Sequence, residues 1–394
     1  MKLLLLYPYP VEPDGQSLQG HYLAKGLKEL GVEVMSCDRE DNLQKLWAYE
    51  YFKPDFVVGI GFWGDTPELI LDPLQNGITP VPWFNADGWV ANYHDVLNKL
   101  PLIAATSNWV KSTYARDGVE GEHVQVAGIG FEPETFHPLP ENSESTKKLR
   151  EMLGVKEDEK MILTIGGDVT SKGAQEMIQA LAKIDKQFSK WKYVMKVWES
   201  RSARVHGKEE RKLIKDLGLD KKKFITLSGK YSPEFMAELL NACDIYAAPS
   251  RLEGFGMIQV EAMACGKPVV SINVGGPRDT IIHGKTGFLV DVAHEIKLEK
   301  EWVYPHMGFD EKMMIEFPLP KTFAYRADIE QLADCTLKLL TDDKLRKTLG
   351  ENAAKHALKN FHYKVIAQKM LSLIEKYAVQ EKEEIELKIK EPSN

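Results

Sequence analysis

The sequence predicts an α/β protein made of two successive doubly wound units with parallel sheets. Short all-apolar runs, which are typical of strands buried in a parallel sheet, alternate with helical segments, and the first run is Leu3–Leu6. Glycine turns follow some of the later runs, as at Gly166-Gly167 and Gly275-Gly276. The length of 394 residues exceeds what one compact core usually holds, so two domains are expected.

The first domain is expected to span residues 1–140. A proline-bearing connection at 133–140 leads into the polar stretch 141–145, which favours a domain boundary at that point. The apolar runs predict further strands at 32–36, 56–60, 80–84, 102–107 and 124–127, with helices at 21–27 and 108–117.

The second domain is expected to span residues 141–361. An insertion at 291–327, rich in aromatic residues and proline and without a clear period, interrupts its pattern. Helices then resume, with ends near Thr341 and Phe361. A last helix covers 362–377, and the Lys/Glu-rich tail up to residue 394 is expected to fray or to project into solvent. Strands are predicted at 161–165, 193–197, 224–227, 245–248 and 268–272, and helices at 176–181 and 261–266.

Charge is distributed unevenly along the chain. Residues 1–140 contain 9 Lys and Arg against 19 Asp and Glu, a balance of −10, whereas the whole chain is at −7. Nucleic acid and anionic membranes bind to basic surfaces, so both are poor partners for the first domain. No apolar run reaches the length of about 18 residues that a membrane-spanning helix needs.

The cysteines and the N-terminus indicate a cytoplasmic protein. Four cysteines are scattered without CxxC or CxxH spacing, which favours reduced packing residues over zinc ligands or disulfides. The apolar start is too short for a signal peptide and is followed at once by Pro8, so a buried first strand is expected.

The stretch 249–290 carries the strongest functional signal. Glu253 and Glu261 stand eight positions apart, with the flexible turn Gly254-Phe255-Gly256 between them. The strand–turn–helix pattern brings helix N-termini, with their free N–H groups, to one edge of the sheet, where they suit a phosphate-bearing ligand. Glu261 is placed to accept hydrogen bonds from a vicinal diol such as ribose. The alternative is that both glutamates are solvated surface acids.

A second candidate is the loop from Gly166 to Gly173, which follows a predicted strand. It fits neither GxGxxG nor a Walker loop, because its order is Ser-Lys-Gly. A glycine turn with hydroxyl groups and Lys172 still suits a phosphate group, with a simple tight turn as the alternative.

Together these motifs resemble the donor-binding region of glycosyltransferase family 4, the group 1 glycosyl transferases. Those are retaining enzymes of the GT-B fold, with two Rossmann-like domains that face each other across a cleft. The resemblance rests on Glu253-Gly-Phe-Gly, Glu261-Ala-Met-Ala-Cys-Gly-Lys-Pro, the turn at Gly275 and Gly284-Lys-Thr-Gly, and it extends over most of the chain. It also implies that the last helix crosses back onto the first domain.

The resemblance implies a role for each matching residue. Glu261 would hold the ribose of a nucleotide sugar, Glu253 would contact the transferred sugar, and Lys172 would stabilise the diphosphate. The chemistry would be a front-face substitution in which the leaving diphosphate helps to deprotonate the acceptor, without a metal ion or other cofactor. The remaining donor-binding positions are Gly15, Gly166, Ser250, Phe255, Gly256 and Met257.

Two departures from the family pattern stand out. Gly167 occupies the place of an arginine, so Lys172 carries more of the phosphate charge, with Thr170, Ser171, Lys196 or Arg201 as possible helpers. The histidine of the N-terminal site loop is also absent. Asn85 and Asp87 lie in that region, and Asp87 is the candidate for contacting the sugar or the acceptor hydroxyl; a turn-forming Asp before Gly88 is the alternative. Nearby aromatic residues that could stack on a sugar ring, or simply form core, are Phe62, Trp63, Trp83, Phe84 and Trp89.

The sequence therefore predicts a retaining, metal-independent hexosyltransferase that uses a nucleoside-diphosphate sugar and a soluble hydroxyl acceptor. The acidic first domain argues against a lipid acceptor at a membrane. A nucleotide-sugar isomerase on the same fold and a non-catalytic binding protein are the alternatives. The base of the donor, UDP, GDP or ADP, stays open, as does the oligomeric state.

Overall fold

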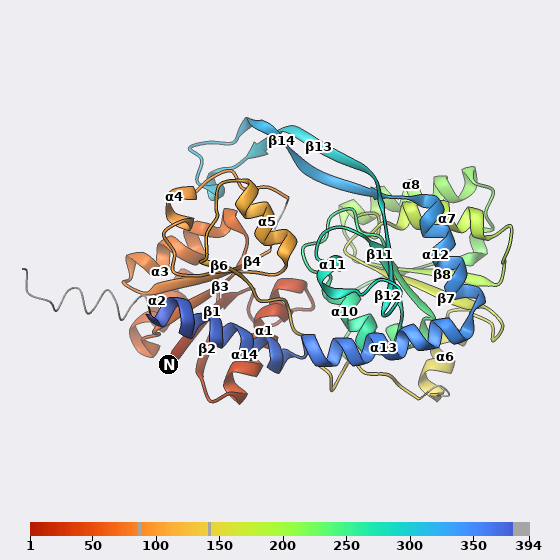
Figure 1. Cartoon of the computed structure of the whole chain (residues 1–394), viewed down its shortest axis with the longest axis horizontal. Helices are drawn as coiled ribbons and strands as arrows, with labels where there is room; N and C mark the ends of the chain where they lie inside the picture. The colour runs from red at the N-terminus through yellow and green to blue at the C-terminus, as the bar shows by residue number, and fades with distance from the viewer. Residues whose placement is uncertain (86–87, 141–142, 381–394) are drawn as a thin grey trace, which may run out of the picture. The chain divides into compact units, whose positions relative to one another are not determined.

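The computed structural model describes residues 1–85, 88–140 and 143–380. The chain divides into two compact units (Figure 1). Unit 1 comprises Met1–Gly130, Leu298–Lys321 and Phe361–Asn394, and unit 2 comprises Phe131–Lys297 and Thr322–Asn360. No helix among the described residues has both the length and the apolar character needed to cross a bilayer.

Unit 1 is built on a parallel six-stranded sheet in the order β2-β1-β3-β4-β5-β6. Leu3, Leu4, Leu5 and Leu6 are fully buried in β1, as their all-apolar run predicts. The strands are β1 Lys2–Tyr7, β2 Glu33–Asp38, β3 Phe56–Gly61, β4 Thr79–Phe84, β5 Ile103–Ala105 and β6 Val124–Val126; the α-helices before residue 130 are α1 Gly15–Glu29, α2 Asn42–Phe52, α3 Asp72–Gln75, α4 His94–Leu97 and α5 Asn108–Arg116.

The end of the described chain also belongs to unit 1. Helix α14, Tyr363–Leu373, packs along α1, and its Tyr363 hydroxyl donates to Glu29 Oε1 at 2.9 Å. A π-helical turn, Ile374–Val379, follows. The last helix thus returns to the first sheet of the chain.

Unit 2 repeats the architecture with the strand order β12-β11-β10-β7-β8-β9. Two apolar helices, α7 and α12, pack on each other and contribute most of the core on one side of this sheet. The strands are β7 Lys160–Ile165, β8 Trp191–Val197, β9 Phe224–Ser228, β10 Ile245–Ala248, β11 Val269–Ile272 and β12 Gly287–Val290; the helices are α6 Glu144–Met152, α7 Ala174–Ile184, α8 Arg201–Asp216, α9 Pro233–Ala242, α10 Met257–Ala264, α11 Pro277–Thr280, α12 Ile329–Thr341 and α13 Asp343–Phe361. Two doubly wound parallel sheets, as predicted, are confirmed.

The domain boundary differs in position from the prediction. The two units separate between Gly130 and Phe131, before the proline-bearing connection rather than after it. The connection packs on unit 2: Asn241 Nδ2 donates to His137 O at 3.1 Å, and Leu139 N donates to Asn241 Oδ1 at 3.0 Å. These contacts, which join positions far apart in the sequence, leave no trace in local composition.

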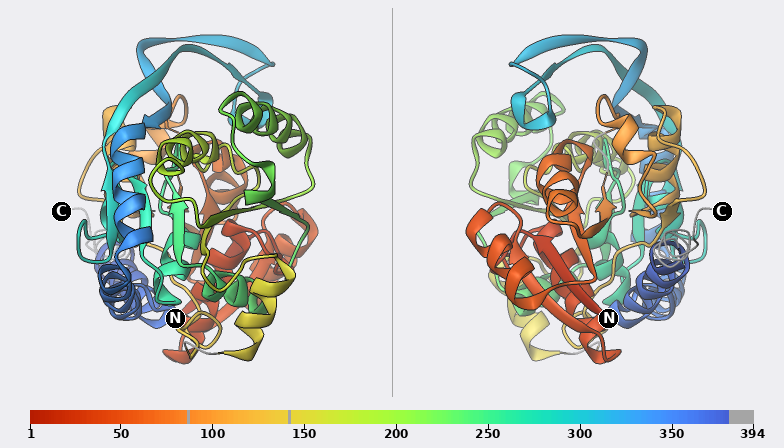
Figure 2. Two further views of the ribbon diagram at one scale, coloured as in Figure 1. Left: turned by 90° about the vertical axis from the view of Figure 1, so that its right-hand side faces the viewer. Right: turned by 90° about the vertical axis from the view of Figure 1, so that its left-hand side faces the viewer.

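The insertion at 291–327 forms regular structure that the sequence pattern did not predict. Strands β13, Val292–Val303, and β14, Met313–Ala327, pair as a two-stranded ribbon (Figure 2). Most β13 side chains are exposed, so the apolar alternation that marks a strand on a core is missing. Residues 298–321 nevertheless join unit 1, where Val303 and Met307 are buried in the same core cluster as Trp63 and Trp89.

Candidate functional site

The predicted donor residues gather where the strand order of unit 2 reverses. β7 and β10 are neighbours in the sheet, and the chain leaves them in opposite directions across it. In open α/β sheets, ligands bind at this position, beyond the carboxyl ends of the strands. The loop from Gly166 to Gly173 follows β7, and the loop from Pro249 to Gly256 follows β10.

Close backbone packing holds the two loops together. Gly173 has a φ of +84°, and a Cβ there would collide with the carbonyl oxygen of Pro249. Arg251 N donates to Ser171 O at 2.9 Å. A Cβ on Gly166 would lie 2.7 Å from Lys172 Cγ, so this glycine allows the lysine to fold back across its own loop.

Lys172 and Glu253 form the ionic centre of the site. Lys172 Nζ donates to Glu253 Oε2 at 2.7 Å, and Ser250 Oγ donates to the same oxygen at 3.3 Å. The lysine side chain is 26% exposed and the glutamate side chain 15%, so the pair lies at the surface of the site. Without ligand, Glu253 therefore neutralises the charge that was predicted to meet a phosphate.

Glu261 has a different environment. It is 5% exposed, and its carboxyl group has no hydrogen-bond or ion-pair partner within the described part of the chain. Burial raises its pKa to about 8. A buried carboxyl group without a donor costs folding free energy, so this position fits the hydroxyl groups of a ligand.

The helix that carries Glu261 begins earlier than predicted. α10 starts at Met257, and Gly256 occupies its N-cap with a φ of +95° and no side-chain cap. Glu261 thus lies in the second turn, and the free N–H groups of the first turn belong to residues nearer the Glu253 loop. Phe255 is buried, at 3% exposure.

The second glycine turn, Gly275-Gly276, packs against the loop that carries Glu253. It was expected to present another helix N-terminus, but α11 has only four residues. Gly276 N instead donates to Glu253 O at 2.8 Å, and a Cβ on Gly276 would clash with the Phe255 backbone. The turn therefore fixes the backbone beside the ionic centre.

One supporting cluster was not predicted from the sequence. Buried Glu176 accepts from Arg251 Nε at 3.1 Å and lies 3.3 Å from Arg326 Nε. Tyr325 N donates to Arg251 O at 2.6 Å. The cluster ties the β10 loop to α7 and β14, and the sequence gives no signal for it because the members are distant along the chain.

The site residues predicted in unit 1 are less defined. Gly15 is the first residue of α1, where the Asp14 side chain accepts from Gln16 N and Ser17 N, and a Cβ on Gly15 would have nothing within 4 Å. Asp87 lies outside the described residues. Asn85 Nδ2 donates to Gln19 Oε1 at 3.1 Å. Of the aromatic residues that could either stack on a sugar ring or form core, four are buried in the core: Trp63, Trp83, Phe84 and Trp89.

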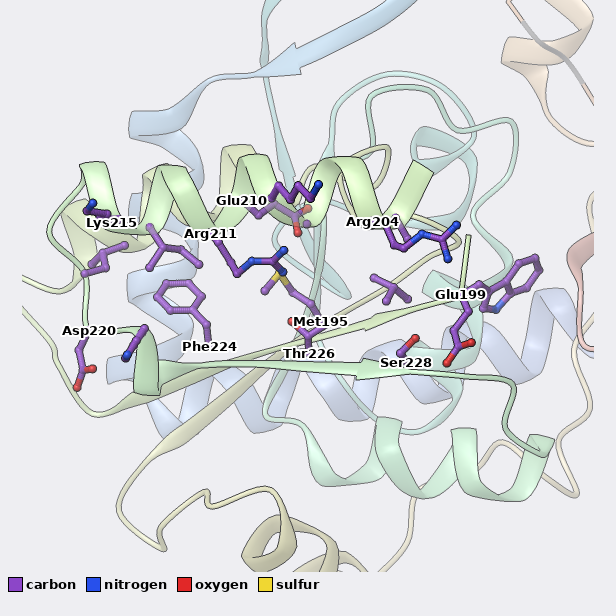
Figure 3. A pocket seen from close by; sticks show the side chains of 18 of the residues that line it. Met195, Glu199, Arg204, Glu210, Arg211, Lys215, Asp220, Phe224, Thr226 and Ser228 are labelled. Carbon is purple, nitrogen blue, oxygen red and sulfur yellow. The ribbon is translucent and has the colours of Figure 1, made fainter. Parts of the chain in front are cut away.

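A cavity of about 1120 Å³ lies between α8 and the strands β8 and β9 (Figure 3). Phe224, Thr226 and Met195 form part of its strand side, and Arg204 and Arg211 extend from the helix (Figure 3). The sequence did not predict this space, because the loose packing of α8 on the sheet is a tertiary property.

Comparison with known proteins identifies the segment that contains the site. Residues 145–301 match the family model described as "Glycosyl transferases group 1". The matched residues include Lys172, Glu253 and Glu261. This stretch of the chain is therefore similar to the group 1 glycosyl transferases.

Curated proteins that the chain resembles carry enzyme names. The chain is 30% identical over 235 residues to D-inositol 3-phosphate glycosyltransferase of Corynebacterium efficiens, covering 59% of this chain and 47% of the relative. It is 27% identical over 225 residues to N-acetyl-alpha-D-glucosaminyl L-malate synthase of Bacillus anthracis, covering 56% of this chain and 47% of that protein. The chain therefore spans about half the length of these curated relatives.

Solved structures extend the similarity of fold beyond residues 145–301. HepE from Anabaena, crystallised with UDP and glucose, superposes with a TM-score of 0.70 at 20% identity and covers 95% of this chain and 100% of its own. Sucrose-phosphate synthase from Thermosynechococcus elongatus gives a TM-score of 0.70 at 18% identity, with 96% and 99% covered. The predicted GT-B fold is confirmed for the chain.

Proposed function

We propose that this protein is a retaining glycosyltransferase that moves a hexose from a nucleoside-diphosphate sugar to a hydroxyl acceptor. The observation that carries the proposal lies where the strand order of unit 2 reverses. There the Lys172–Glu253 pair is combined with the buried carboxyl group of Glu261, which has no partner among the described residues. One cation for a diphosphate and one acceptor of hydroxyl hydrogens match the two polar ends of a nucleotide.

Binding of the donor would rearrange this centre. The diphosphate competes with Glu253 for Lys172, because both are anions that need the same ammonium group. Glu253, released from the lysine, can then accept hydrogen bonds from the hydroxyl groups of the transferred sugar. Ribose hydroxyls donate to Glu261, which supplies the acceptor oxygens that burial has left without partners. In this proposal, the backbone of Gly256 and Met257 also contacts the transferred sugar.

The chemical step in this proposal is a front-face substitution. The bond between C1 of the sugar and the phosphate oxygen breaks, its electron pair moves to the diphosphate, and the acceptor oxygen bonds to C1 on the same face. The acceptor proton passes to the leaving diphosphate. The protein then positions the reactants and stabilises the developing negative charge through Lys172, and the scheme needs no metal ion.

Relatives and fold neighbours support particular partners. HepE was crystallised with UDP and glucose, so UDP-sugars are the first donors to test. The names of two relatives point to inositol phosphate and malate, which are small molecules, and support a soluble acceptor here. A cytoplasmic location belongs to the same proposal and rests on four buried free cysteines: Cys37, Cys243, Cys265 and Cys335.

Calorimetry tests the proposal. The protein is titrated with UDP-glucose, GDP-glucose and ADP-glucose, and one of the three is expected to bind at micromolar concentration. Absence of binding by all three would remove the donor assignment. Incubation with the bound donor alone distinguishes the alternatives: an epimerised sugar nucleotide formed without acceptor would identify an isomerase. Tight binding without turnover across a panel of sugar, sugar-phosphate and polyol acceptors would favour a binding protein.

A further inference from the structure

Lys196, near the end of β8, is a buried lysine without an ionic partner. The residue is 3% exposed, and no carboxylate lies within salt-bridge distance of its ammonium group in the described residues. Its neighbours are two aromatic rings, with Nζ 5.6 Å from the Trp198 centroid and 5.8 Å from that of Tyr231. Burial lowers the pKa of Lys196 to about 8. Such a position is unfavourable for a cation unless an anion joins it.

The backbone places Lys196 directly beside the first glycine loop. It pairs in register with Ile165, the last residue of β7, and Gly166 N donates to Lys196 O at 3.0 Å. Trp198 N donates to Gly167 O at 3.1 Å. A Cβ on Gly167 would meet only a Trp198 ring carbon, at 3.9 Å, so the space above this glycine is open.

The sheet register also sets the direction of the lysine side chain. Tyr246 pairs with Leu163, and Leu163 pairs with Val194, so these three point to one face and Lys196, two residues on, shares it. The Tyr246 hydroxyl donates to Ile165 O at 3.4 Å. Burial, followed by the negative charges of Glu253 and Glu261, raises the pKa of Tyr246. Lys196 therefore lies on the same face of the sheet as Tyr246, whose pKa is raised by burial and by both glutamates.

We propose that Lys196 is a second cation for the diphosphate of the donor, acting beside Lys172. The inference rests on the proposed function. The diphosphate has to compete with Glu253 for Lys172, which Glu253 contacts at 2.7 Å, and a diphosphate leaving group gains negative charge when its bond to the sugar breaks. Lys196 holds an unshared positive charge next to the loop that Lys172 crosses, and the open space at Gly167 lets a phosphate approach it. Lys196 transfers no proton and forms no covalent bond.

Paired titrations with UDP and uridine test this role, because the two ligands differ only in the diphosphate. K196M is expected to weaken UDP binding about tenfold to a hundredfold, as for a lost charge-assisted hydrogen bond, and uridine binding less than twofold. K196R, which keeps the charge, should recover part of the loss. K192M is the matched control, because Lys192 lies on the same face at the other end of β8 and its Nζ donates to Lys222 O at 2.9 Å.

Equal losses for UDP and uridine would show a structural role or a contact with the nucleoside, and unchanged UDP binding would refute any contact. Both outcomes overturn the inference while the wild type still binds UDP, so the proposed function survives them. If the wild type binds GDP or ADP in place of UDP, the same titrations use that diphosphate and its nucleoside. A wild type that binds none of the three diphosphates removes both the inference and the proposed function. If K196M does not fold, as judged by its thermal unfolding, K196Q takes its place in the same pair of titrations.

Discussion

The two sheets have the same architecture, but they differ in how the polar groups are paired at the place where each strand order reverses. In unit 1, where β1 lies beside β3, Arg39 Nη1 donates to Gln16 Oε1 and Ile60 O, each at 3.0 Å, and lies 3.3 Å from Asp65 Oδ2. In unit 2, where β7 lies beside β10, Glu261 and Lys196 have no such partners among the described residues.

The polar groups of unit 1 have partners within the protein, whereas those of unit 2 have hydrogen-bonding capacity that a ligand could use. Polar groups in a folded protein are normally satisfied internally, and the groups around Arg39 follow that rule. Groups that burial leaves without partners are retained at a cost, which a ligand can offset. Under the proposed function, this contrast favours unit 2 as the part of the chain that binds the donor.

The largest expected effect is on the ionic centre. Lys172→Ala should lower turnover about a hundredfold or more, because it removes a charge that stabilises the leaving diphosphate. The measurement is steady-state kinetics with the donor found by calorimetry. Lys183→Ala is the control, since Lys183 on α7 pairs with Glu330 at the surface. Turnover of Lys172→Ala equal to that of the control would place the catalytic cation elsewhere.

Glu261 should govern nucleotide affinity. Glu261→Ala is expected to weaken binding of the nucleoside diphosphate about tenfold to fiftyfold, which corresponds to the loss of its hydrogen bonds with the vicinal ribose hydroxyls. Calorimetry with the free diphosphate measures this without involving the acceptor. The control variant is Asp65→Ala in unit 1. It should leave the affinity for the free diphosphate unchanged. Unchanged affinity in Glu261→Ala would contradict its assignment to the ribose.

The same carboxyl group should also make stability depend on pH. Its folded-state pKa of about 8 lies above the ordinary glutamate value of 4.5, so the folded state binds this proton more tightly than the unfolded state does. This contribution is fully present below pH 4.5 and is lost as the pH rises through about 8. Glu261→Gln should therefore gain thermal stability relative to wild type, by several degrees at pH 8 and little at pH 5. If Glu261→Gln gained the same thermal stability over wild type at pH 5 and at pH 8, folding would not raise the pKa of Glu261.

The smallest expected effect on donor affinity is at Gly15, and it tests whether unit 1 contacts the donor. Gly15→Ala should change the free energy of unfolding by less than about 0.5 kcal/mol, because the added Cβ would meet no atom within 4 Å. If the backbone here approaches the diphosphate, as predicted, donor affinity should still fall several-fold. Loss of affinity without loss of stability would support a ligand contact. Unchanged affinity would restrict the donor site to unit 2.

The sequence by itself determined the alternation of buried strands and helices, the two doubly wound units and the residues of the donor loops. Those features are local: an all-apolar run specifies a buried parallel strand, and a glycine turn specifies a close approach of backbone. The boundaries of α12 and α13, at Thr341 and Phe361, could be predicted for the same reason.

Only the tertiary structure decided which of those residues meet and which have unmet hydrogen-bonding capacity. The sheet order brings β7 beside β10 and so joins Lys172 to Glu253, 81 positions apart. It buries Trp63 and Trp83, which the sequence could equally have placed on a surface, and it leaves Lys196 without a counter-ion among the residues that the structure describes. Burial and pairing depend on neighbours that are distant along the chain, and a local pattern cannot encode them.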